Sequence, residues 1–262
     1  MTQSAPQPLN NTTVARTPRP ITVLQFGSGN FLRGFADWMI QQSNDAGLTD
    51  HGVAIAYATN RPRRHDPLAE QDGLYHVVLE GVRDGRAVRR VDLIDVVQAV
   101  VDPWADYAEY RRIALSPELK LVISNTTEAG IAWSDDDLSV RPAASFPGQV
   151  AQLLHERYEA FDGADEAGLS ILCCELIEAN GTTLQGYVRR HAANAGWGED
   201  FLAWLERANR FYDTLVDRIV PGFPAAEAEA LYAEFGYKDP LMVAAEPFLL
   251  GGRQRRKGRL RS

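Results

Sequence analysis

The stretch Ile21-Thr-Val-Leu-Gln-Phe-Gly-Ser-Gly-Asn-Phe-Leu-Arg-Gly34 decides the fold of this 262-residue chain. A mostly apolar, β-prone run enters a Gly27-x-Gly29 turn, and a helical pattern follows at once. A Rossmann unit begins with a buried parallel strand, a tight turn and a helix. The helix N-terminus then offers free backbone N–H groups to a pyrophosphate. The segment therefore predicts a dinucleotide site.

The glycine turn departs from the usual Gly-x-Gly-x-x-Gly fingerprint. Leu32 holds the third glycine position, and the next glycine is Gly34. A bare Gly-x-Gly also occurs in strand-to-helix turns that bind nothing. The position of this turn, directly after the first strand, is what favours a cofactor.

Strands alternate with helical patterns up to about residue 180, which predicts an α/β fold with a mostly parallel Rossmann-type sheet and flanking helices. Further strands are expected at 53–59, 119–124 and 170–176, and helices at 32–46, 103–115 (N-cap Asp102) and 147–161. Residues 60–72 are expected to form a loop, and 75–79 with 88–97 an inserted β-hairpin. The C-terminal portion is predicted to be helical, at 182–195, 199–208 and 225–235.

Composition divides the chain further. Residues 1–20 are rich in Thr, Pro, Asn and Gln and are expected to be a disordered lead-in. We expect a dinucleotide-binding domain at 21–220, the helical start of a second domain at 221–250, and a basic tail at 251–262. No apolar run is long enough to span a membrane. The adjacent cysteines, Cys173 and Cys174, point to opposite faces of a strand, which fits free thiols in a reducing cytoplasm.

Charge is unevenly distributed. The net charge is −8, but the last twelve residues carry six basic residues and no acid, which leaves −14 for the rest. An acidic body repels phosphate backbones and argues against nucleic acid as a partner. The tail alone would be compatible with a nucleic-acid-binding arm.

The end of the second strand leaves the cofactor type open. Rossmann sites that bind NAD usually carry an acid there for the ribose hydroxyls, but this strand ends in Thr59-Asn60-Arg61. Asn60 is able to bond a ribose, and Arg61, Arg63 or Arg64 is able to meet the 2′-phosphate of NADP. The other interpretation is a solvated basic loop.

Polar side chains follow two further strands. Asn125-Thr126-Thr127-Glu128 comes directly after one strand, and Glu175 with Asn180 follows another. Ligands of open α/β sheets bind at such carboxyl ends, so we expect these residues on one edge. The alternative is a capping role.

Asp217 and Arg218 form an acid–base pair in the helix-like run 214–219. Substrate contact by Asp217 and an internal salt bridge are the two interpretations. The five histidines show no metal-ligand spacing.

Several segments resemble one family. Residues 25–38 (QFGSGNFLRGFADW) are similar to the opening of the tagaturonate reductase, or altronate oxidoreductase, branch of the mannitol dehydrogenase family of long-chain polyol dehydrogenases. The resemblance continues through 71–75, 124–131, 174–177 with 180–181, 214–220, 236–237 and 245–246.

The resemblance implies a metal-independent, NAD-dependent oxidoreductase of hexuronate breakdown that interconverts tagaturonate and altronate, a small sugar acid pair. We expect the cofactor at Val23, Leu24, Gln25, Phe26, Gly27, Ser28, Gly29, Asn30, Phe31, Leu32, Arg33, Gly34, Asn60, Thr126 and Glu128. Substrate contacts are expected from Glu175, Asn180 and Asp217.

One departure from the family is large. Its members continue into a helical catalytic domain that supplies a lysine general base, whereas similarity here stops near Phe248 and the basic tail follows. We therefore expect the catalytic lysine beyond residue 262, a non-native or frameshifted tail, and impaired turnover. A fructuronate or mannitol dehydrogenase and a non-catalytic dinucleotide-binding domain remain alternatives. Oligomeric state is not predicted.

Overall fold

The computed structural model describes residues 7–61, 64–83, 85–127 and 129–253. Six parallel strands form the central sheet in the order β6-β3-β2-β7-β8-β9. They are β2 (Ile21–Phe26), β3 (Gly52–Ala56), β6 (Val97–Val101), β7 (Leu121–Ser124), β8 (Ser170–Cys173) and β9 (Arg210–Tyr212). Counted along the chain, this is the 3-2-1-4-5-6 order of a Rossmann sheet, which confirms the predicted fold class. The strand order reverses between β2 and β7, so a ligand crevice is expected there.

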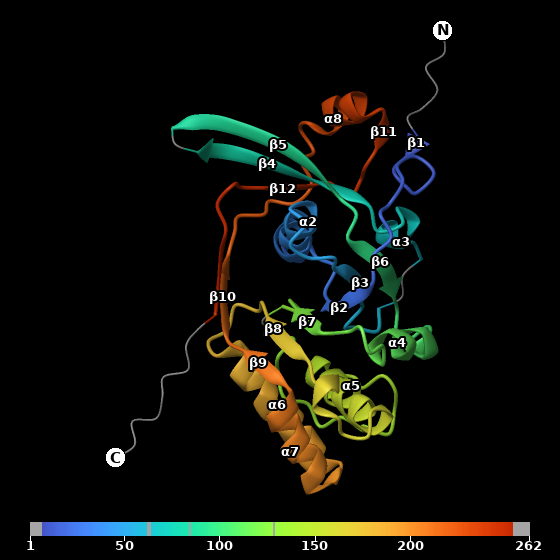
Figure 1. Cartoon of the computed structure of the whole chain (residues 1–262). Coiled ribbons are helices and arrows are strands. Elements are labelled where there is room, and N and C mark those ends of the chain that lie inside the picture. The colour runs from blue at the N-terminus through green and yellow to red at the C-terminus, as the bar shows by residue number, and fades with distance from the viewer. Residues whose placement is uncertain (1–6, 62–63, 84, 128, 254–262) are drawn as a thin grey trace.

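Helices cover both faces of the sheet (Figure 1). One face packs against α4 (Tyr107–Ala114), α5 (Phe146–Ala160), α6 (Asn180–Asn194) and α7 (Gly198–Ala208). The other face meets one continuous helical segment, made of α1 (Asn30–Leu32), the π-helical η1 (Arg33–Asp37) and α2 (Trp38–Asp45). Along β2, Leu24 and Phe26 enter the first core and Val23 enters the second. Burial on both faces explains why this strand is apolar almost throughout.

The predicted hairpin is confirmed. β4 (Tyr75–Arg83) pairs antiparallel with β5 (Arg86–Ile94), and the pair projects beside α2 (Figure 1). β12 (Val243–Ala245) adds a third strand, parallel to β4. Val97 was expected at the end of the hairpin, but it begins β6 of the central sheet instead. The expected loop at 60–72 contains the short helix α3 (Pro67–Glu70).

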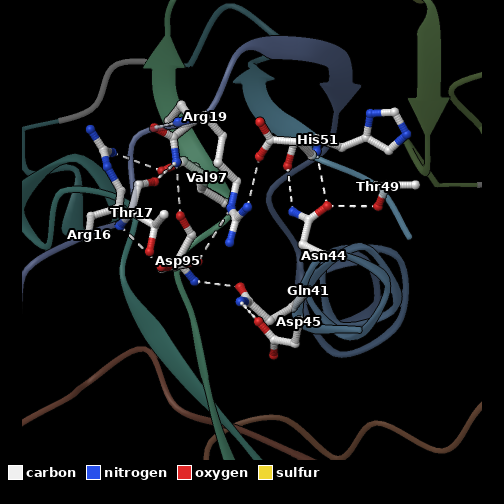
Figure 2. A network of polar contacts seen from close by, with 12 residues as sticks. Arg16, Thr17, Arg19, Gln41, Asn44, Asp45, Thr49, His51, Asp95 and Val97 are labelled. Atoms are coloured by element: carbon white, nitrogen blue, oxygen red, sulfur yellow. Dashed lines mark hydrogen bonds and ion pairs between the residues drawn. The ribbon is translucent and has the colours of Figure 1, made fainter. Parts of the chain in front are cut away.

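The predicted disorder of residues 1–20 is wrong for residues 7–20. β1 (Gln7–Pro8) pairs with β11 (Tyr237–Lys238), and Leu9 is fully buried. The Arg16 guanidinium donates hydrogen bonds to two carbonyl oxygens, of Asp72 and Val97, both at 2.8 Å (Figure 2). These bonds hold the segment against the edge of the sheet. The polar side chains of the segment therefore make specific contacts in the fold.

Two local expectations are also wrong. α4 begins at Tyr107, and its N-cap is Asp106, whose carboxylate accepts from the Glu109 N–H at 2.9 Å; the expected N-cap was Asp102. The run expected to be helix-like forms β10 (Thr214–Asp217), antiparallel to β13 (Leu250–Arg253). Along the chain, α8 (Ala228–Phe235), β11 and β12 lie between β10 and β13. The short helix η2 (Asp165–Ala167) precedes β8.

The basic tail lies largely outside the described residues, since only 251–253 of it belong to β13. In the described part of the chain, no helix has the length and apolarity needed to cross a bilayer.

Candidate functional site

The two glycines of the turn after β2 have different roles. Gly27 has φ +118°, and a Cβ there would lie 2.7 Å from the carbonyl oxygen of Asn125. Gly29 has φ −68°, which any residue adopts, and a Cβ there would meet nothing within 4 Å. Gly27 therefore lets the turn pack against the end of β7. Gly29 leaves space on the outside of the turn, where the helical segment begins at Asn30.

Gly34 takes the role of the missing third glycine. A Cβ on Gly34 would lie 3.0 Å from Val220 and 3.2 Å from Val243, so the glycine lets the helical segment pack closely against the C-terminal part of the chain. Close helix packing is the usual reason for the third glycine of the fingerprint. Leu32, which stands at the standard position, is buried in the core instead.

Arg33 points inward, so it does not face the expected cofactor. Its guanidinium donates to the carbonyl oxygen of Ser28 at 3.2 Å, to Asn30 Oδ1 at 2.6 Å, and to the carbonyl oxygen of Leu241. Burial lowers the pKa of Arg33, while electrostatic interactions with Tyr75 and Asp37 oppose that shift. The arginine thus supports the turn from its inner side.

A buried carboxylate lies beneath the same turn. Asp37 is fully buried, and its Oδ2 accepts hydrogen bonds from the Tyr75 hydroxyl at 2.8 Å and from Gln25 Nε2 at 3.3 Å. Burial raises the pKa of Asp37 to about 6, against those two hydrogen bonds, which lower it. Sequence reasoning missed Asp37. Its signal was the i, i+4 spacing from Arg33, which puts both charged residues on one helix face.

The remaining residues of the expected cofactor segment divide by burial. Val23, Leu24, Phe26 and Leu32 are buried and shape the turn from within. Ser28 and Phe31 are half-buried, whereas Gly29 and Asn30 are exposed.

The polar strand ends meet, as the sequence predicts. Glu175 accepts from the Thr126 N–H, from Thr126 Oγ1 and from Ser124 Oγ, each at 3.0 Å. Burial raises the pKa of Glu175, and the hydrogen bonds from Thr126 and Ser124 oppose the shift. A cavity of about 340 Å³ opens beside these bonds, lined by Asn125, Thr127, Ala129, Glu175 and Leu176. Thr127 lines it with φ +75°, which is unusual for a β-branched residue.

The expected substrate residues are differently placed. Asn180 is buried, and its amide donates to the carbonyl oxygens of Cys173 and Glu175, both at 3.0 Å. It therefore ties the start of α6 to the end of β8. Glu128 lies outside the described residues. Asn60 is exposed just past the end of β3.

Asp217 and Arg218 do not form the internal salt bridge that was one of the two interpretations of this pair. Because β10 is extended, their side chains leave opposite faces, with Asp217 exposed and Arg218 buried. Arg218 instead donates to the carbonyl oxygens of Gly34 at 2.6 Å and Glu246 at 2.9 Å. Among the described residues, no group of three His, Cys, Asp or Glu side chains is placed to hold a metal ion.

The strand order, the glycine turn and the open carboxyl edge define a Rossmann-type dinucleotide-binding domain. The chain belongs to the mannitol dehydrogenase family: the family's mannitol dehydrogenase Rossmann domain matches residues 21–250. That match includes residues 221–250, where the sequence predicted a second domain to start.

Curated relatives agree with this family, and a solved structure agrees with the fold. Altronate oxidoreductases of Halalkalibacterium halodurans and Bacillus subtilis are each 42% identical, over 88% and 89% of this chain and 45% and 49% of their own length. The chain thus spans about half the length of the curated relatives it matches. A solved ternary complex of Pseudomonas fluorescens mannitol 2-dehydrogenase with NAD and D-mannitol superposes with a TM-score of 0.77 at 21% identity, covering 95% of this chain and 55% of that one.

Proposed function

We propose that this chain binds NAD(H) and is the dinucleotide-binding part of an oxidoreductase that interconverts tagaturonate and altronate. The observation that carries the proposal is the turn after β2, where Gly27 packs under Asn125 and Gly29 leaves open space before the helical segment. Identity of 42% to proteins named altronate oxidoreductase supports the substrate class, a small sugar acid.

We propose NAD in preference to NADP. The solved mannitol 2-dehydrogenase complex of the same fold contains NAD. Asn60 is exposed at the carboxyl edge of the sheet, where an amide can bond the ribose hydroxyls. Arg61, on the same segment, is the residue that would favour the 2′-phosphate of NADP, so the two cofactors need direct comparison.

The cavity beside Asn125 and Glu175 is the place we propose for the reacting end of the cofactor. Glu175 lines that cavity and accepts hydrogen bonds from the N–H and Oγ1 of Thr126, which the sequence places at the cofactor together with Glu128. We propose that Glu175 and Asn180 act on the substrate side by fixing this edge, and that Asp217 contacts the substrate. The lysine base that the resemblance implies is proposed beyond residue 262.

Cofactor binding is the activity to test on this chain, because the chain spans about half the length of its curated relatives. Purified chain is titrated with NADH and with NADPH, and the fluorescence of the reduced nicotinamide is followed. Saturable binding of NADH, tighter than that of NADPH, is expected. Absence of saturable binding of either cofactor at millimolar concentration would overturn the proposal.

A turnover assay distinguishes an active enzyme, and its substrate, from a dinucleotide-binding part alone. Oxidation of NADH with tagaturonate, fructuronate or fructose compares the altronate branch with its fructuronate and mannitol siblings. NADH binding without turnover of any of the three is the result expected of the dinucleotide-binding part alone. We further propose a reducing cytoplasm as its location, because Cys173 and Cys174 are both free and buried.

A further inference from the structure

Two successive carbonyl groups of the glycine turn are held toward the protein interior. Gln25 Nε2 donates to the carbonyl oxygen of Gly27 at 3.1 Å, and Arg33 Nε donates to that of Ser28 at 3.2 Å. Both peptide units are trans, and the N–H of a trans peptide unit points away from its C=O. The N–H groups of Ser28 and Gly29 therefore point outward, where Gly29 leaves open space.

Both supports are tied to one carboxylate. Asp37 Oδ2 accepts from Gln25 Nε2 at 3.3 Å and from the Tyr75 hydroxyl at 2.8 Å. The Tyr75 hydroxyl also lies 3.4 Å from the Arg33 carbonyl oxygen, and the Arg33 guanidinium carbon lies 5.3 Å from the centre of the Tyr75 ring. One buried side chain thus connects to the carbonyl of Gly27 through Gln25 and to that of Ser28 through Tyr75 and Arg33.

Packing alone gives no reason for a carboxylate at this position. In the sequence, Asp37 stands between Phe35-Ala36 and Trp38, which all belong to or pack against the apolar core on that face of the sheet. A buried carboxylate is costly unless hydrogen bonds compensate it, and an apolar residue of similar volume is often at least as stabilising. A role in fixing the turn accounts for the carboxylate.

We propose that Asp37 is a positioning residue: through Gln25, and through Tyr75 with Arg33, it holds two successive peptide units so that their N–H groups face an incoming pyrophosphate. This rests on the proposed binding of a dinucleotide. The ligand chemistry it serves is the diphosphate, since backbone N–H groups on a glycine turn bind anionic oxygens.

The test replaces Tyr75 by Phe, which removes the hydroxyl and keeps the ring. The matched control is Tyr107→Phe, because the Tyr107 hydroxyl donates to Glu156 over the same 2.8 Å, away from the turn. Loss of one hydrogen bond to a charged group is expected to raise the Kd of Tyr75→Phe for NADH and for inorganic pyrophosphate about tenfold. Tyr107→Phe is expected to leave both Kd values unchanged.

A spectroscopic readout separates positioning from loss of stability. The backbone amide resonances of Ser28 and Gly29 are expected to shift in Tyr75→Phe and to stay in place in Tyr107→Phe. If Tyr75→Phe does not fold, Gln25→Met removes the other support and keeps the side-chain shape, with the same expected rise in Kd.

The outcomes distinguish the two proposals. If the unsubstituted chain binds NADH, and a folded Tyr75→Phe or Gln25→Met variant binds it equally well with unmoved amide resonances, the positioning role is overturned and the proposed function stands. If the unsubstituted chain does not bind NADH, the proposed function fails and the positioning role fails with it.

Discussion

Replacing Gly29 by Val separates cofactor binding from folding. The backbone there is extended, with φ −68° and ψ 165°, and a Cβ would meet no atom within 4 Å. A valine fits that conformation and restricts the unfolded chain, so the free energy of unfolding is expected to stay within about 1 kcal/mol of the parent value. The open space that the valine fills is where the pyrophosphate is expected to approach.

The effect on affinity follows from the outward N–H groups of Ser28 and Gly29. Hydrogen bonds to charged groups contribute about 1.5–3 kcal/mol each. Displacing the pyrophosphate from both costs at least about 3 kcal/mol, or roughly a hundredfold in Kd. NADH fluorescence titration measures that loss, and thermal or urea unfolding checks the stability.

Two variants serve as controls. Gly186→Val also adds side-chain atoms where a Cβ has open space, but on α6, so NADH affinity is expected to be unchanged. Gly27→Ala, in contrast, is expected to lower the free energy of unfolding by about 2–4 kcal/mol. The reason is that φ at this position is +118° and the added Cβ would lie 2.7 Å from the carbonyl oxygen of Asn125. A folded Gly29→Val chain that binds NADH within threefold of the parent would refute the placement of the cofactor on this turn.

Two further predictions concern buried charges. Burial raises the pKa of Asp37 from 3.8 to about 6, so the folded chain binds this proton more tightly than the unfolded chain. The free energy of unfolding is therefore higher at low pH and falls by about 3 kcal/mol as pH rises from 4 through 6. Asp37→Asn should remove that part of the pH dependence in urea unfolding between pH 4 and 7, and an unchanged slope would contradict it. Arg218→Ala removes the hydrogen bonds of its guanidinium to the carbonyl oxygens of Gly34 and Glu246, with an expected loss of about 2–4 kcal/mol in the free energy of unfolding. Arg112→Ala is the control, because Arg112 forms an exposed ion pair with Glu109, and its melting temperature is expected to equal that of the parent chain. Equal melting temperatures for the two variants would show that Arg218 is dispensable.

The sheet and its glycine turn could be predicted because their signals are local. The apolar run of β2, the Gly27-x-Gly29 turn and the polar strand ends lie within short segments whose periodicity is readable. The meeting of Thr126 and Glu175 was predictable for the same reason, since the carboxyl ends of parallel strands share an edge.

The errors arise where distant residues decide the structure. Leu9 is buried because β1 pairs with β11, more than two hundred residues further along the chain. β10 is a strand because β13 supplies its partner, and a strand of only four residues is too short to show its period in the sequence. Arg33 points inward because it bonds the carbonyl of Leu241, whereas the sequence shows only a basic residue beside an expected phosphate site.

The packing around Gly34 also bears on the order in which this protein can mature during synthesis. Arg33 bonds to Leu241, Gly34 packs against Val220 and Val243, and Arg218 bonds to the Gly34 carbonyl. All six parallel strands have been translated by residue 212, yet these supports of the turn come later. A nascent chain halted there would have the six strands but not the contacts of Arg33 and Gly34 with residues 218–243, so the packing of the helical segment after the turn would be completed only after the sheet.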